Sequence, residues 1–256
     1  MQPLTAAPLT EFEREKYSRQ LRVEGFGEQA QMKMKAATAL VSRVGGVGGT
    51  AAMNLVRAGI GRLILVHHGV LTTEYLNRMQ LIYEEDVGKP LVATWASRLR
   101  AINPALEIVE VAEYMSDANA SDLIAQCDIV VDGAPLFEER YAMNRAAVKH
   151  GKPLCMGAMY STEGYVSTFV PGKTPCLACV YPTAPDYWTN IKVFPAIGPG
   201  PVMIGTTVAM EAIKVITGFG TPLFNKLWFL DIENSSTRQL NIKRRPDCPV
   251  CGHLHH

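Results

Sequence analysis

A glycine-rich turn between two apolar segments constrains the fold of this chain more than any other feature. Residues 38–44, TALVSRV, are apolar and rich in β-formers, as are residues 62–68, RLILVHH. Between them, GGTAAMNLVRAG at 48–59 begins with glycines and ends at Gly59, which predicts a helix. Strand, helix and strand in this order predict two parallel strands joined by a crossover helix.

The alternation of helix and strand continues for about ninety residues beyond this unit. Its pattern predicts three more helices, at 89–103, 117–126 and 138–151, and three more strands, at 107–114, 128–134 and 153–159. Strands that alternate with helices favour an α/β fold built on a doubly wound, mainly parallel sheet. We therefore expect a single α/β domain over residues 37–256.

Both ends of the chain depart from this alternation. At the start, Thr10 and Glu13 form a capping box, which predicts helices from Glu11 to about Arg22 and over 28–36, so residues 1–36 form a helical arm. After Gly157, the segments 163–172, 226–233 and 237–245 predict an antiparallel extension. A helix over 205–218 interrupts it, and the Pro/Gly-rich residues 182–205 are typical of a lid or crossover loop.

Composition excludes several functional classes. The net charge of +1 over 256 residues argues against nucleic-acid binding. No stretch reaches the ~20 apolar residues that span a membrane, and the first residues lack the pattern of a targeting segment. We therefore expect a cytoplasmic protein.

Four of the six cysteines form two C-x-x-C pairs, in PCLACV and DCPVCG. Each pair places two thiolates on one turn, and four thiolates complete a tetrahedral zinc shell without a position for a reactive water. The sequence therefore predicts a structural zinc site formed by Cys176, Cys179, Cys248 and Cys251. Cys127 and Cys155 lie in apolar surroundings and are predicted to be core residues.

Several short motifs occur together with the glycine turn and the cysteine pairs: YSRQL at 17–21, LNRMQL at 76–81 and AMEAIK at 209–214. In this combination the chain resembles the ThiF/MoeB family, relatives of the ubiquitin-activating enzymes. The resemblance implies a Rossmann-like fold and a homodimer. It also implies adenylation, with ATP and Mg²⁺, of a carboxylate such as the C-terminal glycine of a ubiquitin-like sulfur carrier.

The resemblance also assigns candidate residues. Arg19 matches the arm arginine that in the family reaches the phosphates of the partner subunit, and Arg78 matches a phosphate ligand, so both are candidate catalytic residues. The remaining candidates are predicted to line a nucleotide or ligand pocket: Gly45, Gly46, Gly48, His67, Tyr75, Lys89 and Asp132.

Four positions depart from the family pattern. Arg43 replaces the first glycine of the turn, where a side chain is expected to crowd a pyrophosphate. His67 replaces the acid that holds the ribose, and imidazole is a poor substitute for two carboxylate oxygens. Leu91 replaces a phosphate-binding lysine, for which Lys89 could substitute. Asp132 is kept, but Pro135 replaces the magnesium-binding acid.

These departures affect four different parts of MgATP, so ordinary adenylation is not expected. The first hypothesis is a non-adenylating partner or scaffold, in a homodimer or with a related subunit, that lends Arg19 to an active site. The second is altered chemistry in a pocket lined by His67, His68, Tyr75, Arg78 and Lys89. An active adenylyltransferase acting on a ubiquitin-like carrier, a peptide or a small carboxylate stays open, as does a dinucleotide site over Gly46, Gly48 and Ala51.

Overall fold

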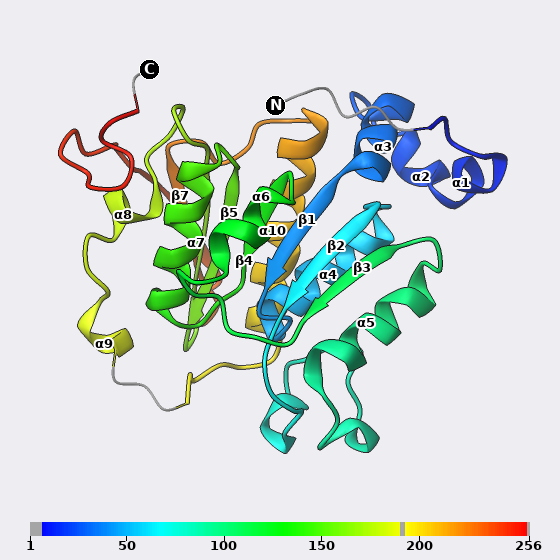
Figure 1. Ribbon diagram of the computed structural model, residues 1–256, viewed down its shortest axis with the longest axis horizontal. Helices are drawn as coiled ribbons and strands as arrows, with labels where there is room; N and C mark the ends of the chain where they lie inside the picture. The colour runs from blue at the N-terminus through cyan, green and yellow to red at the C-terminus, as the bar shows by residue number, and fades with distance from the viewer. Residues whose placement is uncertain (1–6, 190–192, 255–256) are drawn as a thin grey trace.

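The computed structural model describes residues 7–189 and 193–254, and in this part of the chain eight strands form one sheet (Figure 1). Their order is β3-β2-β1-β4-β5-β6-β7-β8. Strands β1 to β5 are parallel and β6 to β8 are antiparallel, so the predicted mainly parallel fold with an antiparallel extension is confirmed. The strands are β1 Thr38–Ser42, β2 Arg62–Val66, β3 Glu107–Val111, β4 Ile129–Asp132, β5 Leu154–Tyr160, β6 Glu163–Phe169, β7 Lys226–Asp231 and β8 Ser236–Asn241.

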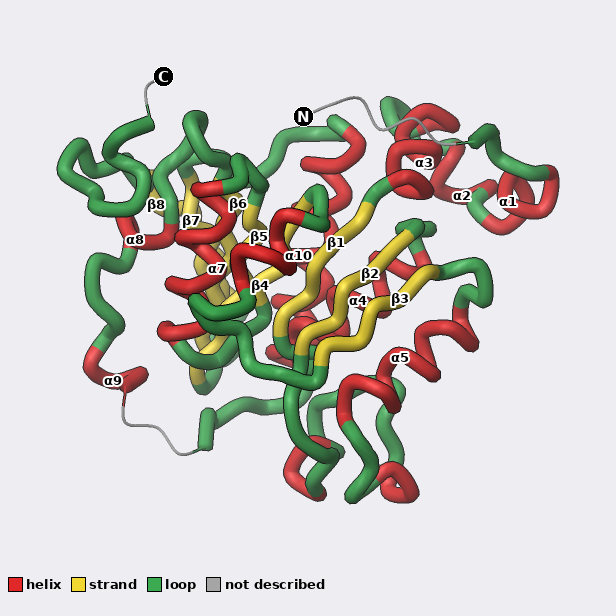
Figure 2. Tube along the Cα trace, viewed as in Figure 1, coloured by secondary structure: helices red, strands yellow, loops and turns green. Residues whose placement is uncertain are grey.

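Helices cover both faces of the sheet (Figure 2). The α-helices are α1 Glu11–Lys16, α2 Ser18–Leu21, α3 Gly27–Ala36, α4 Gly46–Arg57, α5 Leu91–Ile102, α6 Ala120–Ala125, α7 Phe137–Lys149, α8 Leu177–Val180, α9 Asp186–Thr189 and α10 Pro199–Thr217. Two short 3₁₀ helices, η1 Thr73–Tyr75 and η2 Glu84–Asp86, follow β2.

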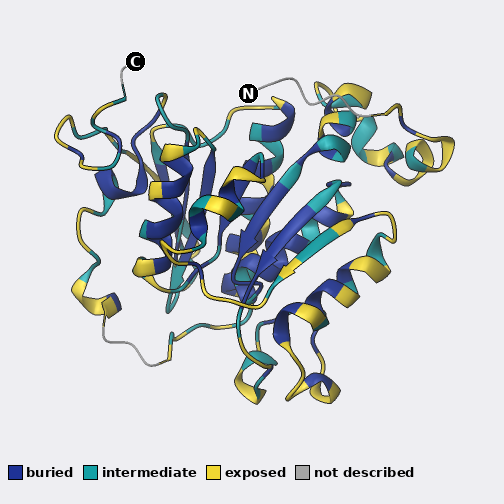
Figure 3. Ribbon diagram, viewed as in Figure 1, coloured by how far each residue is buried: buried dark blue, intermediate teal, exposed yellow. Residues whose placement is uncertain are grey.

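Two apolar cores lie on opposite faces of the sheet because successive strand residues point in opposite directions. Val41 packs in one core with residues of α4, α5 and α10, whereas Leu40 packs in the other with residues of α6 and α7. The central strands are therefore buried on both faces (Figure 3), as expected of a parallel sheet covered by helices.

The longest helix, α10, begins six residues earlier than the sequence predicts. Pro199 and Pro201 occupy its first turn, where a missing N–H leaves no bond unmade, and Gly218 ends it with φ +78°. By length and composition this helix could cross a membrane, but 56% of its most apolar stretch of 18 residues is buried inside the protein. It packs against α4, β5 and β6, so α10 is a core helix of the fold.

The first three helices precede β1 and lie at its amino end (Figure 1). The predicted capping box is present, because Thr10 Oγ1 accepts from the Glu13 N–H at 3.2 Å and Glu13 Oε2 accepts from the Thr10 N–H at 2.7 Å. The predicted helix from Glu11 to Arg22 is interrupted at Tyr17, which is buried with its ring packed close to Gly59. Tyr17 is both the C-cap of α1 and the N-cap of α2.

Candidate nucleotide-type pocket and cysteine cluster

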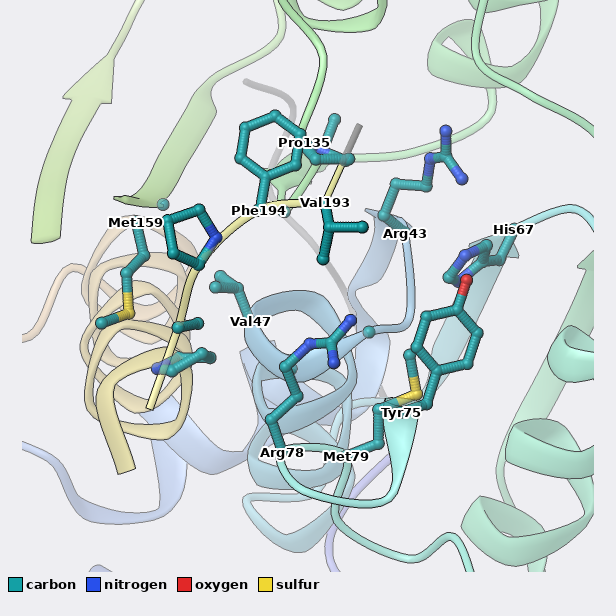
Figure 4. A pocket seen from close by; sticks show the side chains of 18 of the residues that line it. Arg43, Val47, His67, Tyr75, Arg78, Met79, Pro135, Met159, Val193 and Phe194 are labelled. Atoms are coloured by element: carbon teal, nitrogen blue, oxygen red, sulfur yellow. The ribbon is translucent and has the colours of Figure 1, made fainter. Parts of the chain in front are cut away.

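A cavity of about 270 Å³ lies at the carboxyl edge of the sheet, beside the end of β1 (Figure 4). Strand order reverses between β1 and β4, and open α/β sheets bind ligands at such a switch point. The walls come from the glycine turn before α4, the end of β2, the η1 segment, the turn after β4 and the chain at 193–196.

The glycines of the turn have different roles. Gly45 precedes α4 as its N-cap and lines the cavity together with Gly46. Gly48 lies outside the lining, and a Cβ there would meet the Arg43 carbonyl at 2.3 Å. This glycine therefore allows α4 to approach the end of β1 closely, which is a packing requirement.

Arg43 lines the cavity but makes its main contacts on the side facing α7. Its φ is +56°, in the left-handed region that favours glycine, which is the residue type the family pattern has there. The guanidinium donates to the Glu139 carboxylate at 2.6 and 2.9 Å and lies 4.5 Å from the centre of the Tyr114 ring. The Arg43 side chain therefore joins the end of β1 to α7 and to the chain after β3.

His67 directly follows the last residue of β2 and is 5% exposed. Burial, and next the nearby charge of Arg43, lower the pKa of His67 to about 3. The ring is therefore neutral at physiological pH, and its Nδ1 has no hydrogen-bond partner among the described atoms. A neutral ring stands where the family pattern has a carboxylate.

Arg78 and Tyr75 both line the cavity. The Arg78 guanidinium donates to the Glu74 carbonyl and to Asn77 Oδ1, and lies 5.2 Å from the Tyr75 ring centre. Burial lowers the pKa of Arg78, although a guanidinium stays charged at neutral pH. In the described part of the chain no carboxylate forms an ion pair with it.

Three other candidate residues lie outside the cavity lining. Lys89 pairs with Asp86 at 2.8 Å. Asp132 is fully buried beneath the cavity, where burial raises the pKa of its carboxyl group and the Arg140 guanidinium at 2.8 Å opposes that shift. Arg19 is exposed on α2, near the amino end of β1, whereas the cavity lies at the carboxyl end.

The sequence did not identify the apolar roof of the cavity. Trp188, Val193 and Phe194 line it from the Pro/Gly-rich segment, which the sequence indicated only as a lid or crossover loop. The indole of Trp188 donates to the Pro135 carbonyl at 2.5 Å and joins the roof to the turn after β4. Aromatic residues within such a segment are the signal that could have pointed to them.

The two cysteine pairs come together near the carboxyl end of the chain. All four sulfur atoms lie within 4.8 Å of one another, with Cys176–Cys248 at 3.7 Å and Cys179–Cys251 at 3.4 Å. A tetrahedral zinc ion with Zn–S bonds of about 2.3 Å requires sulfur separations of about 3.8 Å, so the cluster fits such an ion.

N–H groups surround the cluster. Asn144 Nδ2 donates to Cys176 Sγ at 3.6 Å, and the Arg245 N–H donates to Cys179 Sγ at 3.5 Å. Such donors stabilise thiolates, the form that binds a metal. The four cysteines could therefore hold a metal ion such as zinc.

The doubly wound sheet, the glycine turn at its switch point and the cysteine cluster define the class: an α/β protein with a nucleotide-type pocket and four cysteines that could hold a metal ion. Residues 17–250 match the model of the ThiF family, and the chain belongs to that family. The predicted resemblance is confirmed.

Relatives match over nearly the whole chain. The heterocyst HesA protein of Trichormus variabilis is 41% identical over 244 residues, which cover 95% of this chain and 91% of that protein. The sulfur carrier protein adenylyltransferase of Thermus thermophilus is 35% identical, with 95% and 92% covered.

Solved structures show the same fold. MccB of E. coli with ATP superposes with a TM-score of 0.83 at 26% identity, over 96% of this chain and 76% of that one. MccB with MccA-N7isoASN gives 0.84 at 26%, over 93% and 75%. This chain is thus similar to proteins whose names include adenylyltransferases and to a structure that contains ATP.

Proposed function

We propose that this chain is a non-adenylating subunit of an activating complex built from ThiF-family proteins. The observation that carries the proposal is the charge of the cavity lining. Among the described lining residues Glu74 is the one acid, so the lining offers a metal ion a single carboxylate, and that side chain lies at the exposed rim of the cavity. Mg²⁺ requires carboxylates or phosphates with free oxygens.

The other positions that would hold MgATP support the proposal. Pro135 stands at the metal-binding position, and Asp132 is committed to Arg140 below the cavity. The neutral ring of His67 cannot accept two hydrogen bonds from ribose hydroxyls as a carboxylate does. The pocket therefore lacks the side chains that would hold the ribose of ATP and the magnesium ion.

Arg19 supports a role in trans. Arg19 is exposed on α2, at the opposite end of β1 from the cavity of its own chain. We therefore propose that it serves the pocket of a partner subunit. The partner is a second copy or, better, a relative that keeps the acids. The names of relatives include a sulfur carrier protein adenylyltransferase, and a solved structure of MccB contains MccA, so we propose a protein or peptide carboxylate as the acceptor. We also propose that the four cysteines hold a zinc ion. The proposed location is the cytoplasm.

Exchange of radioactive pyrophosphate into ATP tests the proposal. We expect no magnesium-dependent exchange by the isolated chain, and we expect this chain to stimulate exchange by a family member that keeps the acids. Arg19→Ala is expected to abolish the stimulation, whereas Arg22→Ala, an exposed arginine at the end of the same helix, is expected to leave it unchanged. Robust exchange by the isolated chain would refute the proposal.

A second candidate function is binding of a compact oxyanion without a metal ion. It corresponds to the hypothesis that the same pocket carries out altered chemistry. It is favoured by Arg78, a cation without an ion-pair partner among the described residues, beside the amino end of α4. Calorimetric titration of inorganic phosphate in EDTA tests it, and loss of binding in Arg78→Ala is the expected result.

A further inference from the structure

Two cavities lie side by side along the carboxyl edge of the sheet. The first, of about 270 Å³, has Arg43 and His67 in its wall. The second, of about 550 Å³, has Tyr114 and Glu139 in its wall. The Arg43 side chain contacts both of these second-cavity residues, so it stands between the two spaces.

The turn after β4 borders both spaces. Pro135 lines the first cavity, and its neighbour Leu136 lines the second. Arg43 approaches this segment from the other side of the cleft, through its bond to Glu139 at the start of α7. The Arg43 side chain and Glu139 thus lie at the boundary between the two cavities.

A bound nucleotide would have to pass this point. In doubly wound sheets the phosphates sit at the amino end of the first crossover helix, and the ribose lies beside the end of the second strand. Here these places are the start of α4 and His67. Both places line the first cavity, so it is the base attached to the ribose that would extend past the end of β1, where Arg43 and the His68–Tyr114 ring pair lie.

We infer that Arg43 is the residue that excludes nucleosides from this pocket, acting as a partition held in place by Glu139 and Tyr114. The inference rests on the proposed function and deepens it, since it states which ligands the remaining pocket rejects. The first cavity is slightly below the usual volume of small-molecule pockets and has room for a compact anion at Arg78.

The partition is held firmly. Glu139 accepts three hydrogen bonds from Arg43, two from Nε and one from a terminal nitrogen, and Arg43 and Glu139 are 9% and 4% exposed. Breaking such a buried pair to move the side chain aside leaves a charge without a partner. A nucleoside therefore cannot displace Arg43 merely by contact.

Calorimetric titration of AMP in EDTA tests the partition, because AMP without metal isolates nucleoside binding from magnesium chemistry. We expect Arg43→Gly to bind AMP at least tenfold more tightly than the native chain. Glycine fits the positive φ at this position and removes the side chain that stands between the two cavities. Arg57→Ala, an exposed arginine on α4, is the control for loss of one positive charge and is expected to leave AMP affinity unchanged.

The variant Arg43→Gly with Glu139→Gln keeps the test valid if the single variant does not fold, because the neutral amide needs no buried counter-charge. Circular dichroism establishes folding of each protein. A folded variant that binds AMP less than tenfold more tightly than the native chain would overturn the partition. Pyrophosphate exchange by the native chain would refute the proposed function instead, and the ratio of AMP affinities would still decide the role of Arg43.

Discussion

His67 makes the stability of the fold depend on pH in a calculable direction. Its pKa is about 3 in the folded chain and about 6.5 when unfolded, so the unfolded state takes up its proton first as the pH falls. The stabilising contribution is complete above about pH 6.5 and is lost as the pH falls toward 3. We expect about 2 kcal/mol of this loss between pH 7.5 and pH 5.

Urea unfolding at the two pH values measures this loss, with His67→Asn as the comparison. The variant is expected to lose less stability on acidification, and a part is expected to persist because the pKa of His68 is also lowered, to about 4. If His67→Asn showed the same pH dependence as the native chain, protonation of His67 would not be the cause of the loss of stability.

Single residues also show how far sequence reasoning reaches. The resemblance to the ThiF/MoeB family assigned Gly45, Gly46 and His67 to one ligand pocket, and in the structure these three residues line one cavity. The sequence could not foresee the contact of Arg43 with Glu139, since no local pattern joins residues 96 positions apart. Lys89 pairs with Asp86, three residues earlier, and this local ion pair competes with a role in the pocket.

The packing of helix α4 against strand β1 depends on one glycine of the turn. A Cβ at position 48 would lie 2.3 Å from the Arg43 carbonyl and 2.7 Å from the Ser42 carbonyl, which are backbone atoms with little freedom to move. We expect Gly48→Ala to destabilise the fold by about 1–3 kcal/mol, measured by thermal unfolding.

Gly45→Ala is the matched control, in the same turn. There the nearest atom to an added Cβ is the end of the flexible Met79 side chain, at 3.5 Å, so less than about 1 kcal/mol should be lost. Equal destabilisation by the two variants would show that conformational freedom, and not close packing, explains the glycine at position 48.

The elements were predicted well where their apolar period was regular and less well at their ends. Helix α4 begins at Gly46 rather than Gly48. The turn ends at Gly45, and the glycines that follow it already belong to the helix. Helix α10 begins at Pro199, in a stretch whose prolines and glycines are typical of a loop. Proline suits the first turn of a helix, but only the packing of α10 on α4 shows that a helix begins there.

The cysteine cluster gives the whole molecule a long-range clip between residues 72 positions apart. By the loop-closure argument used for disulfides, a clip of this length stabilises the fold by up to about 4 kcal/mol. With a zinc ion bound, we therefore expect removal of the metal to lower the melting temperature by about 10 °C. The expected metal content is about one zinc per chain, since four thiolates complete one shell.

Cys248→Ala tests this clip, with Cys127→Ala as the control because it removes the same side chain from a buried position outside the cluster. We expect Cys248→Ala to lose most of its zinc, measured by mass spectrometry of the metal, together with the fall in melting temperature. Cys127→Ala should retain its zinc, although its own cavity lowers stability slightly. A folded native chain without metal, or a Cys248→Ala variant that melts with the native chain, would leave the four thiols as ordinary core residues.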